Sequence, residues 1–146
     1  MNPRSLHIVA LVALALSGCT DSTSPGSGRS VGVIQRGSRS LGAILSPDTV
    51  QVGAVFQATV NTWGSSSCTI PDGVDLTLQG NLAIVTPYDR SPTGNAVCTA
   101  DISPRPHHVT LRFTSAGAAT IQAIGYRLDG SGRALTSVDR SVTVVP

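Results

Sequence analysis

The sequence contains neither lysine nor glutamate, and aromatic residues are scarce. Its ten basic residues are all Arg and its eight acidic residues are all Asp, so two good helix formers are missing. With two Phe, two Tyr and one Trp, a broad aromatic platform for stacking bases or sugars is excluded. The Arg residues are scattered along the chain and nearly balanced by Asp, which argues against a nucleic-acid partner. Val, Thr, Gly, Ser and Pro are abundant instead, a composition typical of strands joined by turns.

From Ser40 onward, short alternating apolar runs are separated by Gly, Pro, Asn and Asp, which is the pattern of an all-β sandwich or barrel. Side chains two residues apart share one face of a strand. The alternation places these groups on strand faces: Phe56, Ala58, Val60 and Thr62; Val74, Leu76 and Leu78; Ala96, Cys98, Ala100 and Ile102; Val109, Leu111 and Phe113; Ala119, Ile121 and Ala123; Val138, Arg140, Val142 and Val144. We expect about seven strands, with a tight reversal at Asp129-Gly130.

The N-terminal residues have the layout of a cleaved signal peptide. Arg4 supplies a positive charge, and Leu6 to Leu16 is a nearly apolar stretch of eleven residues followed by small residues. A permanent membrane-spanning helix needs about 20 apolar residues, so this stretch is too short for one. We therefore expect residues 1–18 to be a leader that is removed on export.

The leader ends in Leu16-Ser17-Gly18-Cys19, which resembles the lipobox of bacterial lipoproteins. The resemblance implies that Cys19 is lipid-modified, that cleavage occurs just before it, and that the mature protein is held at the membrane by several acyl chains. Thr20 follows the cysteine, which by analogy favours the outer membrane in a diderm, with the domain in the periplasm or on the cell surface. The alternative is an ordinary secretory leader that leaves Cys19 as a free thiol.

A tether is expected after the lipidated cysteine, over residues 19–39. Nine of the eleven residues in 20–30 are Ser, Thr, Gly or Pro, which is a disordered composition. Such a linker of roughly 20 residues spans on the order of 25 Å. Val31 to Ile34 is a small apolar patch within it that we expect to be unstructured, a short edge strand being the alternative. The folded domain is then expected to cover residues 40–146.

Residues 46–60 and 113–126, closing on 141–145, resemble bacterial immunoglobulin-like domains. In those domains a Pro-led first strand precedes a Gly turn, and a late strand of Gly, a small residue, Thr and Ile pairs with the terminal strand. The resemblance implies an immunoglobulin-like antiparallel β-sandwich of about seven strands. The chain departs from the antibody pattern because Trp63 precedes both remaining cysteines, so the antibody-type core Trp is not carried over.

If Cys19 carries lipid, Cys68 and Cys98 remain as an even pair in an exported protein, where disulfides persist. We predict a bridge between them that staples a loop to a strand. The chain-entropy model assigns about 3 to 4 kcal/mol to closing such a loop. A redox-active or metal-binding pair is the alternative, but the CxxC spacing is absent.

Other chemistry-bearing residues give no recognisable constellation. His107 and His108 are adjacent and point to opposite faces of a strand, so we interpret them as exposed polar residues and not as ligands of one metal. Turn formation and solvation account for Asp72, Asp75, Asp89 and Asp101, with a calcium site as the alternative. Ser65 to Ser67 lack the GxSxG elbow, and no phosphate-binding loop is present. We therefore predict no catalytic residues, no metal site and no cofactor.

These features together predict a membrane-anchored lipoprotein whose non-catalytic domain binds a protein partner in the cell envelope or serves a structural role there. Recognition through loops or by strand addition at an open edge suits such a sheet. The alternative is a small-ligand or ion-binding envelope lipoprotein that uses the loops around Trp63, Asp72 and Asp89. A hydrolase with an unrecognised site is the weakest of the hypotheses.

Overall fold

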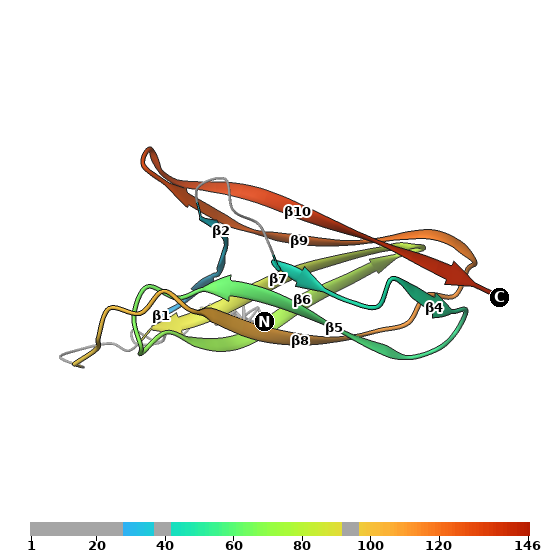
Figure 1. The fold of residues 1–146 in the computed structure, drawn as a ribbon, viewed down its shortest axis with the longest axis horizontal. Helices are drawn as coiled ribbons and strands as arrows, with labels where there is room; N and C mark the ends of the chain where they lie inside the picture. The colour runs from blue at the N-terminus through green and yellow to red at the C-terminus, as the bar shows by residue number, and fades with distance from the viewer. Residues whose placement is uncertain (1–27, 37–41, 92–96) are drawn as a thin grey trace, which may run out of the picture.

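The computed structural model describes residues 28–36, 42–91 and 97–146 (Figure 1). The leader, Cys19 and the first part of the tether lie outside these residues. The described chain forms ten strands: β1 (Gly28–Val31), β2 (Val33–Arg36), β3 (Ile44–Leu45), β4 (Thr49–Gln51), β5 (Phe56–Trp63), β6 (Ile70–Gln79), β7 (Leu82–Ser91), β8 (Pro104–Leu111), β9 (Gly117–Asp129) and β10 (Gly132–Val145). The all-β prediction is confirmed, with ten strands in place of about seven.

Two sheets enclose one hydrophobic core. The larger sheet contains β6, β7, β9, β10 and β4, with β1 and β2 inserted between β7 and β9, and the smaller sheet has the order β3-β5-β8. The long β9–β10 hairpin and the β5–β8 pair form opposite sides of the molecule (Figure 1). The expected pairing of the late strand with the terminal strand is confirmed, and the reversal between them lies at Gly130 and Ser131.

The larger sheet is mixed and not purely antiparallel. Three of its pairings are parallel: β7 with β9, β2 with β9, and β4 with β10. Parallel neighbours require a chain crossover, and β8 of the smaller sheet lies in the crossover from β7 to β9. The expectation of an antiparallel sandwich is corrected in this respect.

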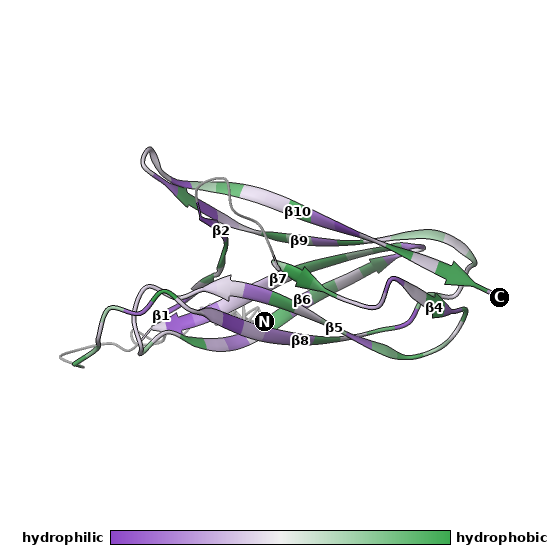
Figure 2. Ribbon diagram, viewed as in Figure 1, coloured by the Kyte–Doolittle hydropathy of each residue, from purple (hydrophilic) through white to green (hydrophobic). Residues whose placement is uncertain are grey.

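Alternation along the strands places the core as the sequence predicts. Ala58, Val60 and Thr62 of β5 are buried, as are Val109, Leu111 and Phe113 along and just after β8. Ala119, Ile121 and Ala123 of β9 and Val142 and Val144 of β10 complete the inner faces. Along β10 the hydropathy also changes from hydrophilic in the middle to hydrophobic at the C-terminal end, where Val142 and Val144 are buried (Figure 2).

The prediction that Val31 to Ile34 is unstructured is wrong. β1 pairs with β7, β2 pairs with β9, and Ile34 is completely buried in the core. Gly32 marks the crossing point, because its N–H donates to the Pro87 carbonyl on β7 and its carbonyl accepts from Tyr126 N–H on β9. The segment 28–36 therefore fills the space where β7 and β9 diverge, and it belongs to the folded domain.

Two further expectations are corrected. The strand expected around Cys98 does not form, since residues 97–103 are in no strand and Ile102 is exposed. The β6 strand does form, but Leu76 and Leu78 on the expected face remain substantially exposed because the smaller sheet does not cover them. Within the described ranges, no helix is long and apolar enough to cross a membrane.

Candidate functional site

A polar cluster lies at one end of the core and joins the two sheets. Thr62 of β5 and His107 of β8 belong to the smaller sheet, while Asp89 of β7 belongs to the larger one. Thr62 Oγ1 donates to Asp89 Oδ1 at 2.8 Å, and His107 Nε2 lies 3.1 Å from the same oxygen. All three residues are at least 94% buried. The alternation that buries the apolar residues of each strand therefore carries these three side chains into the same interior layer.

The contacts of His107 indicate how this cluster is satisfied. Its Nδ1 lies 3.2 Å from the Gly73 carbonyl, which can only accept, and its Nε2 faces the Asp89 carboxylate. Both ring nitrogens thus face oxygen acceptors, and Thr62 donates to the same carboxylate. Removing one member of this buried cluster leaves polar groups of the others without partners, which is costly. The prediction that His107 is exposed is therefore wrong, whereas His108 is exposed as expected.

The same geometry does not fit a nucleophile–base–acid relay. In such a relay the imidazole contacts the nucleophile through one nitrogen and the acid through the other. Here Thr62 and Asp89 both lie near Nε2, at 3.2 and 3.1 Å, while Nδ1 is used by a backbone carbonyl. Thr62 is also fully buried, so no substrate reaches its hydroxyl. The cluster acts as a structural link between the sheets.

A cavity of about 240 Å³ lies next to this cluster, and Asp89 forms part of its wall. The β1–β2 segment contributes Val31, Val33 and Arg36, the end of β5 contributes Trp63, and the β9–β10 hairpin contributes Leu128 and Arg133. The lining is therefore mixed, because the hydroxyl residues Ser30, Ser65, Thr69 and Ser91 lie beside these apolar and cationic side chains. It is assembled from segments that are far apart in the sequence.

Two nitrogen donors beside the cavity lack acceptors. Arg36 Nη1 and Trp63 Nε1 are both buried without a hydrogen-bond partner in the part of the chain that the structure describes. A buried unsatisfied donor costs about 1–3 kcal/mol, so such groups call for an explanation. Arg133 differs, since it donates to the Val31 carbonyl at 2.6 Å and stacks over the Tyr126 ring at 3.7 Å. Arg36 and Trp63 are therefore the unsatisfied members of the wall.

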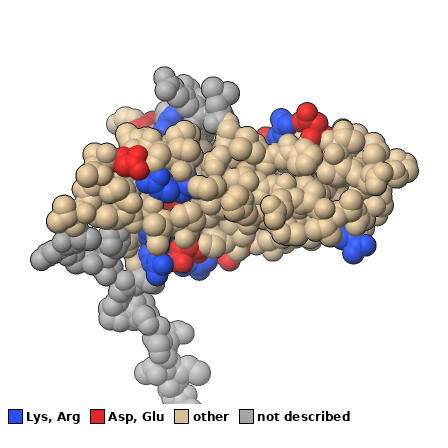
Figure 3. Space-filling model, turned by 60° about the horizontal axis from the view of Figure 1, so that its bottom comes forward, with Lys and Arg blue, Asp and Glu red and all other residues tan. Residues whose placement is uncertain are grey.

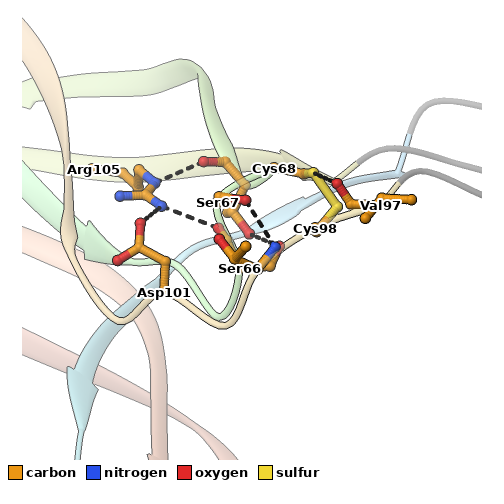
Figure 4. Close-up of a disulfide and its surroundings, with 9 residues drawn as sticks. Ser66, Ser67, Cys68, Val97, Cys98, Asp101 and Arg105 are labelled. Carbon is orange, nitrogen blue, oxygen red and sulfur yellow. Dashed lines mark hydrogen bonds and ion pairs between the residues drawn. A yellow bond between two sulfur atoms is a disulfide. The ribbon is translucent and has the colours of Figure 1, made fainter.

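The loop beside the cavity is fixed by the disulfide and by Arg105. Cys68 and Cys98 are bridged as predicted, with their Cα atoms 5.6 Å apart, but the bridge joins two loops and not a loop to a strand (Figure 4). The Arg105 guanidinium donates to the Thr69 carbonyl at 2.7 Å and the Ser66 carbonyl at 3.0 Å, and contacts Asp101 at 2.8 Å (Figure 4). Because Ser65 and Thr69 line the cavity, these links hold one of its walls in place.

The four Asp residues considered as calcium ligands have separate partners. Asp72 lies 3.8 Å from Arg29, Asp75 accepts from the Tyr88 hydroxyl at 2.8 Å, and Asp101 contacts Arg105. Asp89 is buried in β7 and does not lie in or beside a loop as expected. Across residues 28–36, 42–91 and 97–146, no group of three or more His, Cys, Asp or Glu side chains is placed to hold a metal ion. Of the three residues suggested for a ligand site, Trp63 and Asp89 line the cavity and Asp72 does not.

A second candidate feature is the outer edge of β10. The β6 edge contains Pro71 and an irregularity in register next to Gly73, and the β8 edge contains Pro104 and Pro106. Prolines and bulges are devices that prevent strand addition. β10 has neither: its register against β9 runs without a shift from Gly132 to Val144. β4 covers only Thr143 to Val145, so residues 132–142 have no strand on their outer side among those the structure describes.

The direction of the free backbone groups on β10 follows from its contacts with β4. Thr143 N–H donates to the Asp48 carbonyl, and the Val145 carbonyl accepts from Val52 N–H, so the backbone groups of these residues point away from β9. Backbone direction alternates along an antiparallel strand, and no bulge interrupts β10. The N–H and C=O groups of the odd-numbered residues 133–141 therefore point to the open edge.

Charged side chains are few and of both signs on the β5–β8 side of the molecule, which Figure 3 turns toward the viewer. The charged side chains in the middle of β10 have partners, since Asp139 accepts a hydrogen bond from Gln122 at 3.1 Å and Arg140 forms an ion pair with Asp48. Leu135, by contrast, is 68% exposed.

Comparisons of this chain with protein-family models, with curated proteins and with solved structures found no match.

Proposed function

We propose that this chain is a bacterial envelope lipoprotein, anchored through Cys19, whose immunoglobulin-like β-sandwich is a non-catalytic binding module that receives an extended segment of a protein partner along β10. The open edge of residues 132–142 carries this proposal. Strand addition gains affinity from backbone hydrogen bonds and specificity from alternate side chains. The odd-numbered residues of β10 offer a row of such groups next to exposed Leu135.

The proposed export and membrane anchoring of the protein rest on its sequence. Arg4, the apolar stretch Leu6 to Leu16 and the segment Leu16-Ser17-Gly18-Cys19 support export and lipidation. With β1 beginning at Gly28, the residues between Cys19 and the first strand form a connection of eight residues, 20–27. An anchor on so short a connection keeps the domain near the membrane surface. The proposed location is the outer membrane of a diderm, with the domain in the periplasm or on the surface.

The anchor is tested by metabolic labelling with an alkyne analogue of palmitate in a bacterium expressing the full chain. Wild type is expected to incorporate label and to sediment with membranes, and mass spectrometry should find the mature N-terminus at Cys19. Cys19→Ser should lose the label, whereas Cys68→Ser should keep it. Equal labelling of Cys19→Ser, or a mature N-terminus at another residue, would contradict the anchor.

The edge is tested by placing a photoreactive amino acid at position 135 and irradiating intact cells. The photoreactive residue at position 135 is expected to give a crosslinked adduct with the partner, of one reproducible mass. The same residue at position 78, an exposed site on the Pro-containing β6 strand, is expected to give none. Ser137→Pro removes one outward N–H, a change that edge strands tolerate, and it should abolish the adduct without unfolding the domain. Ser137→Thr keeps that N–H and should preserve the adduct.

Two results would overturn the proposed edge. One is an adduct from position 78 identical to that from position 135, which would place the partner elsewhere. The other is an adduct that survives Ser137→Pro at its original yield while circular dichroism shows the domain to be folded. Either result leaves the anchor unaffected, so the two parts of the proposal are tested separately.

A further inference from the structure

We propose that the cavity between the β1–β2 segment, the end of β5 and the β9–β10 hairpin is a binding site for a small organic monocarboxylate with an apolar body. Arg133 of β10 lines the cavity as well, but the inference rests on Arg36 and Trp63, which are not part of the β10 edge. It extends the proposed function from one partner surface to a second, small-molecule site.

The polar groups at the wall favour an anion. Arg36 Nη1 and Trp63 Nε1 are donors without acceptors among the residues that the structure describes, and both residues line the cavity. The one carboxylate, on Asp89, is already engaged by Thr62 and His107. A carboxylate seated against Arg36 would supply two acceptor oxygens in the planar geometry that a guanidinium matches.

The size and the remaining lining favour a small apolar body on that carboxylate. Val31, Val33 and Leu128 provide apolar surface, and the indole of Trp63 adds to it. At about 240 Å³ the cavity is smaller than the roughly 300–1,000 Å³ of sites for drug-sized ligands. An apolar cavity of roughly 150 Å³ suffices for benzene, so a single ring with a carboxylate is the expected scale of ligand.

Because Trp63 is the only Trp in the chain, its fluorescence and its indole N–H resonance report directly on the site. The experiment titrates the full mature domain with benzoate and follows Trp63 fluorescence and the indole N–H resonance by NMR. Saturable changes in both signals are expected with benzoate. Benzyl alcohol, which has the same ring without the charge, should bind at least about tenfold more weakly. Inorganic phosphate, an anion without an apolar body, should also bind more weakly than benzoate.

Single-residue variants test whether the carboxylate of benzoate binds at Arg36. Arg36→Met should weaken benzoate binding by about ten- to a hundredfold, because it removes a charge-assisted hydrogen bond. Arg112→Met is the matched control, since Arg112 is exposed and does not line the cavity. This variant should bind benzoate with the affinity of wild type. Trp63→Phe keeps a ring but removes the N–H, and ligand-observed NMR should show weakened binding. This variant keeps the test available if Arg36→Met fails to fold.

Three outcomes would overturn the inference. The first is the absence of any saturable change in the Trp63 signals up to tens of millimolar benzoate. The second is equal binding of benzoate and benzyl alcohol, or tighter binding of phosphate, which would remove the carboxylate or the apolar body from the proposal. The third is equal weakening by Arg36→Met and Arg112→Met, which would reduce the effect to net charge.

Discussion

His107 of β8 and Asp89 of β7 join the two sheets through a buried contact of 3.1 Å between Nε2 and Oδ1. Thr62 donates to the same carboxylate, and the second ring nitrogen of His107 faces the Gly73 carbonyl. The apolar core thus ends in a polar layer in which each group has a partner. Because these partners come from four strands, β5 to β8, the cluster fixes the position of the two sheets relative to one another beside the cavity.

Asp89→Ala is expected to destabilise the domain by about 3–5 kcal/mol, since it leaves His107 and Thr62 buried without their shared acceptor. Urea denaturation measures this change. Asp48→Ala is the control: its carboxylate is exposed and paired with Arg140, so the loss should stay below about 1 kcal/mol. Similar losses in the two variants would show that the cluster contributes no more than a surface pair.

Gly32→Ala is expected to destabilise the domain by about 1–3 kcal/mol through overpacking. A Cβ at this position would lie 2.9 Å from Asp89 Oδ2 and would collide with the methyl group of Thr62. Thr62→Ser removes that methyl group and should recover part of the stability lost in Gly32→Ala. Gly130→Ala, where a Cβ meets nothing within 4 Å, should be nearly neutral in the same thermal unfolding assay. A neutral Gly32→Ala would mean that β1 and β2 do not pass so close to the cluster.

Ile34→Ala is expected to cost about 2–5 kcal/mol, as for other large side chains truncated in a core. Ile34 is completely buried between the sheets, although it lies in a segment whose composition suggests a tether. Val55→Ala, at a residue that is 66% exposed, provides the comparison and should cost less than about 0.5 kcal/mol. If calorimetry gives the two variants the same midpoint, residues 28–36 are not part of the cooperative domain.

The sequence was informative wherever one strand's own alternation decides burial. Phe56 to Thr62 and Val109 to Phe113 show their inner faces directly, and the odd cysteine count led to the Cys68–Cys98 bridge that the structure contains. β1 and β2 could not be predicted in this way. They are four residues each, follow a Ser- and Gly-rich stretch, and become strands only because β7 and β9 diverge and leave unpaired backbone for them.

The cavity and the polar cluster were missed for the same reason. Trp63, Arg36 and Arg133 come from separate segments, and no local pattern relates them. A signal for the cluster was available, however. Thr62, Asp89 and His107 each continue the inward-facing alternation of an apolar strand, and a polar residue on such a face needs a buried partner. Cys98 was placed in a strand because its neighbours alternate, but the disulfide and Arg105 hold residues 97–103 as a loop.

Acid should weaken the loop cluster around Arg105. Hydrogen bonds from Arg105 and then from Ser103 hold the pKa of the Asp101 carboxyl below its ordinary value. A carboxyl with a lowered pKa in the folded state stabilises it above the ordinary pKa of about 3.9, and this contribution is lost as the pH falls through the folded-state pKa. Asp101→Asn should therefore lose less stability than wild type on acidification below about pH 4. Parallel pH profiles of the urea midpoint in the two proteins would contradict this role.

Amide hydrogen exchange along β10 tests the open edge most directly. In the free domain, the amides of Leu135, Ser137 and Asp139 should exchange fast because they point outward, while those of Thr136, Val138 and Arg140 bond to β9 and should be protected. In the complex captured through position 135, the three outward amides should become protected as well. Protection of all six amides in the free monomer, or unchanged fast exchange of the outward three in the complex, would contradict strand addition at this edge.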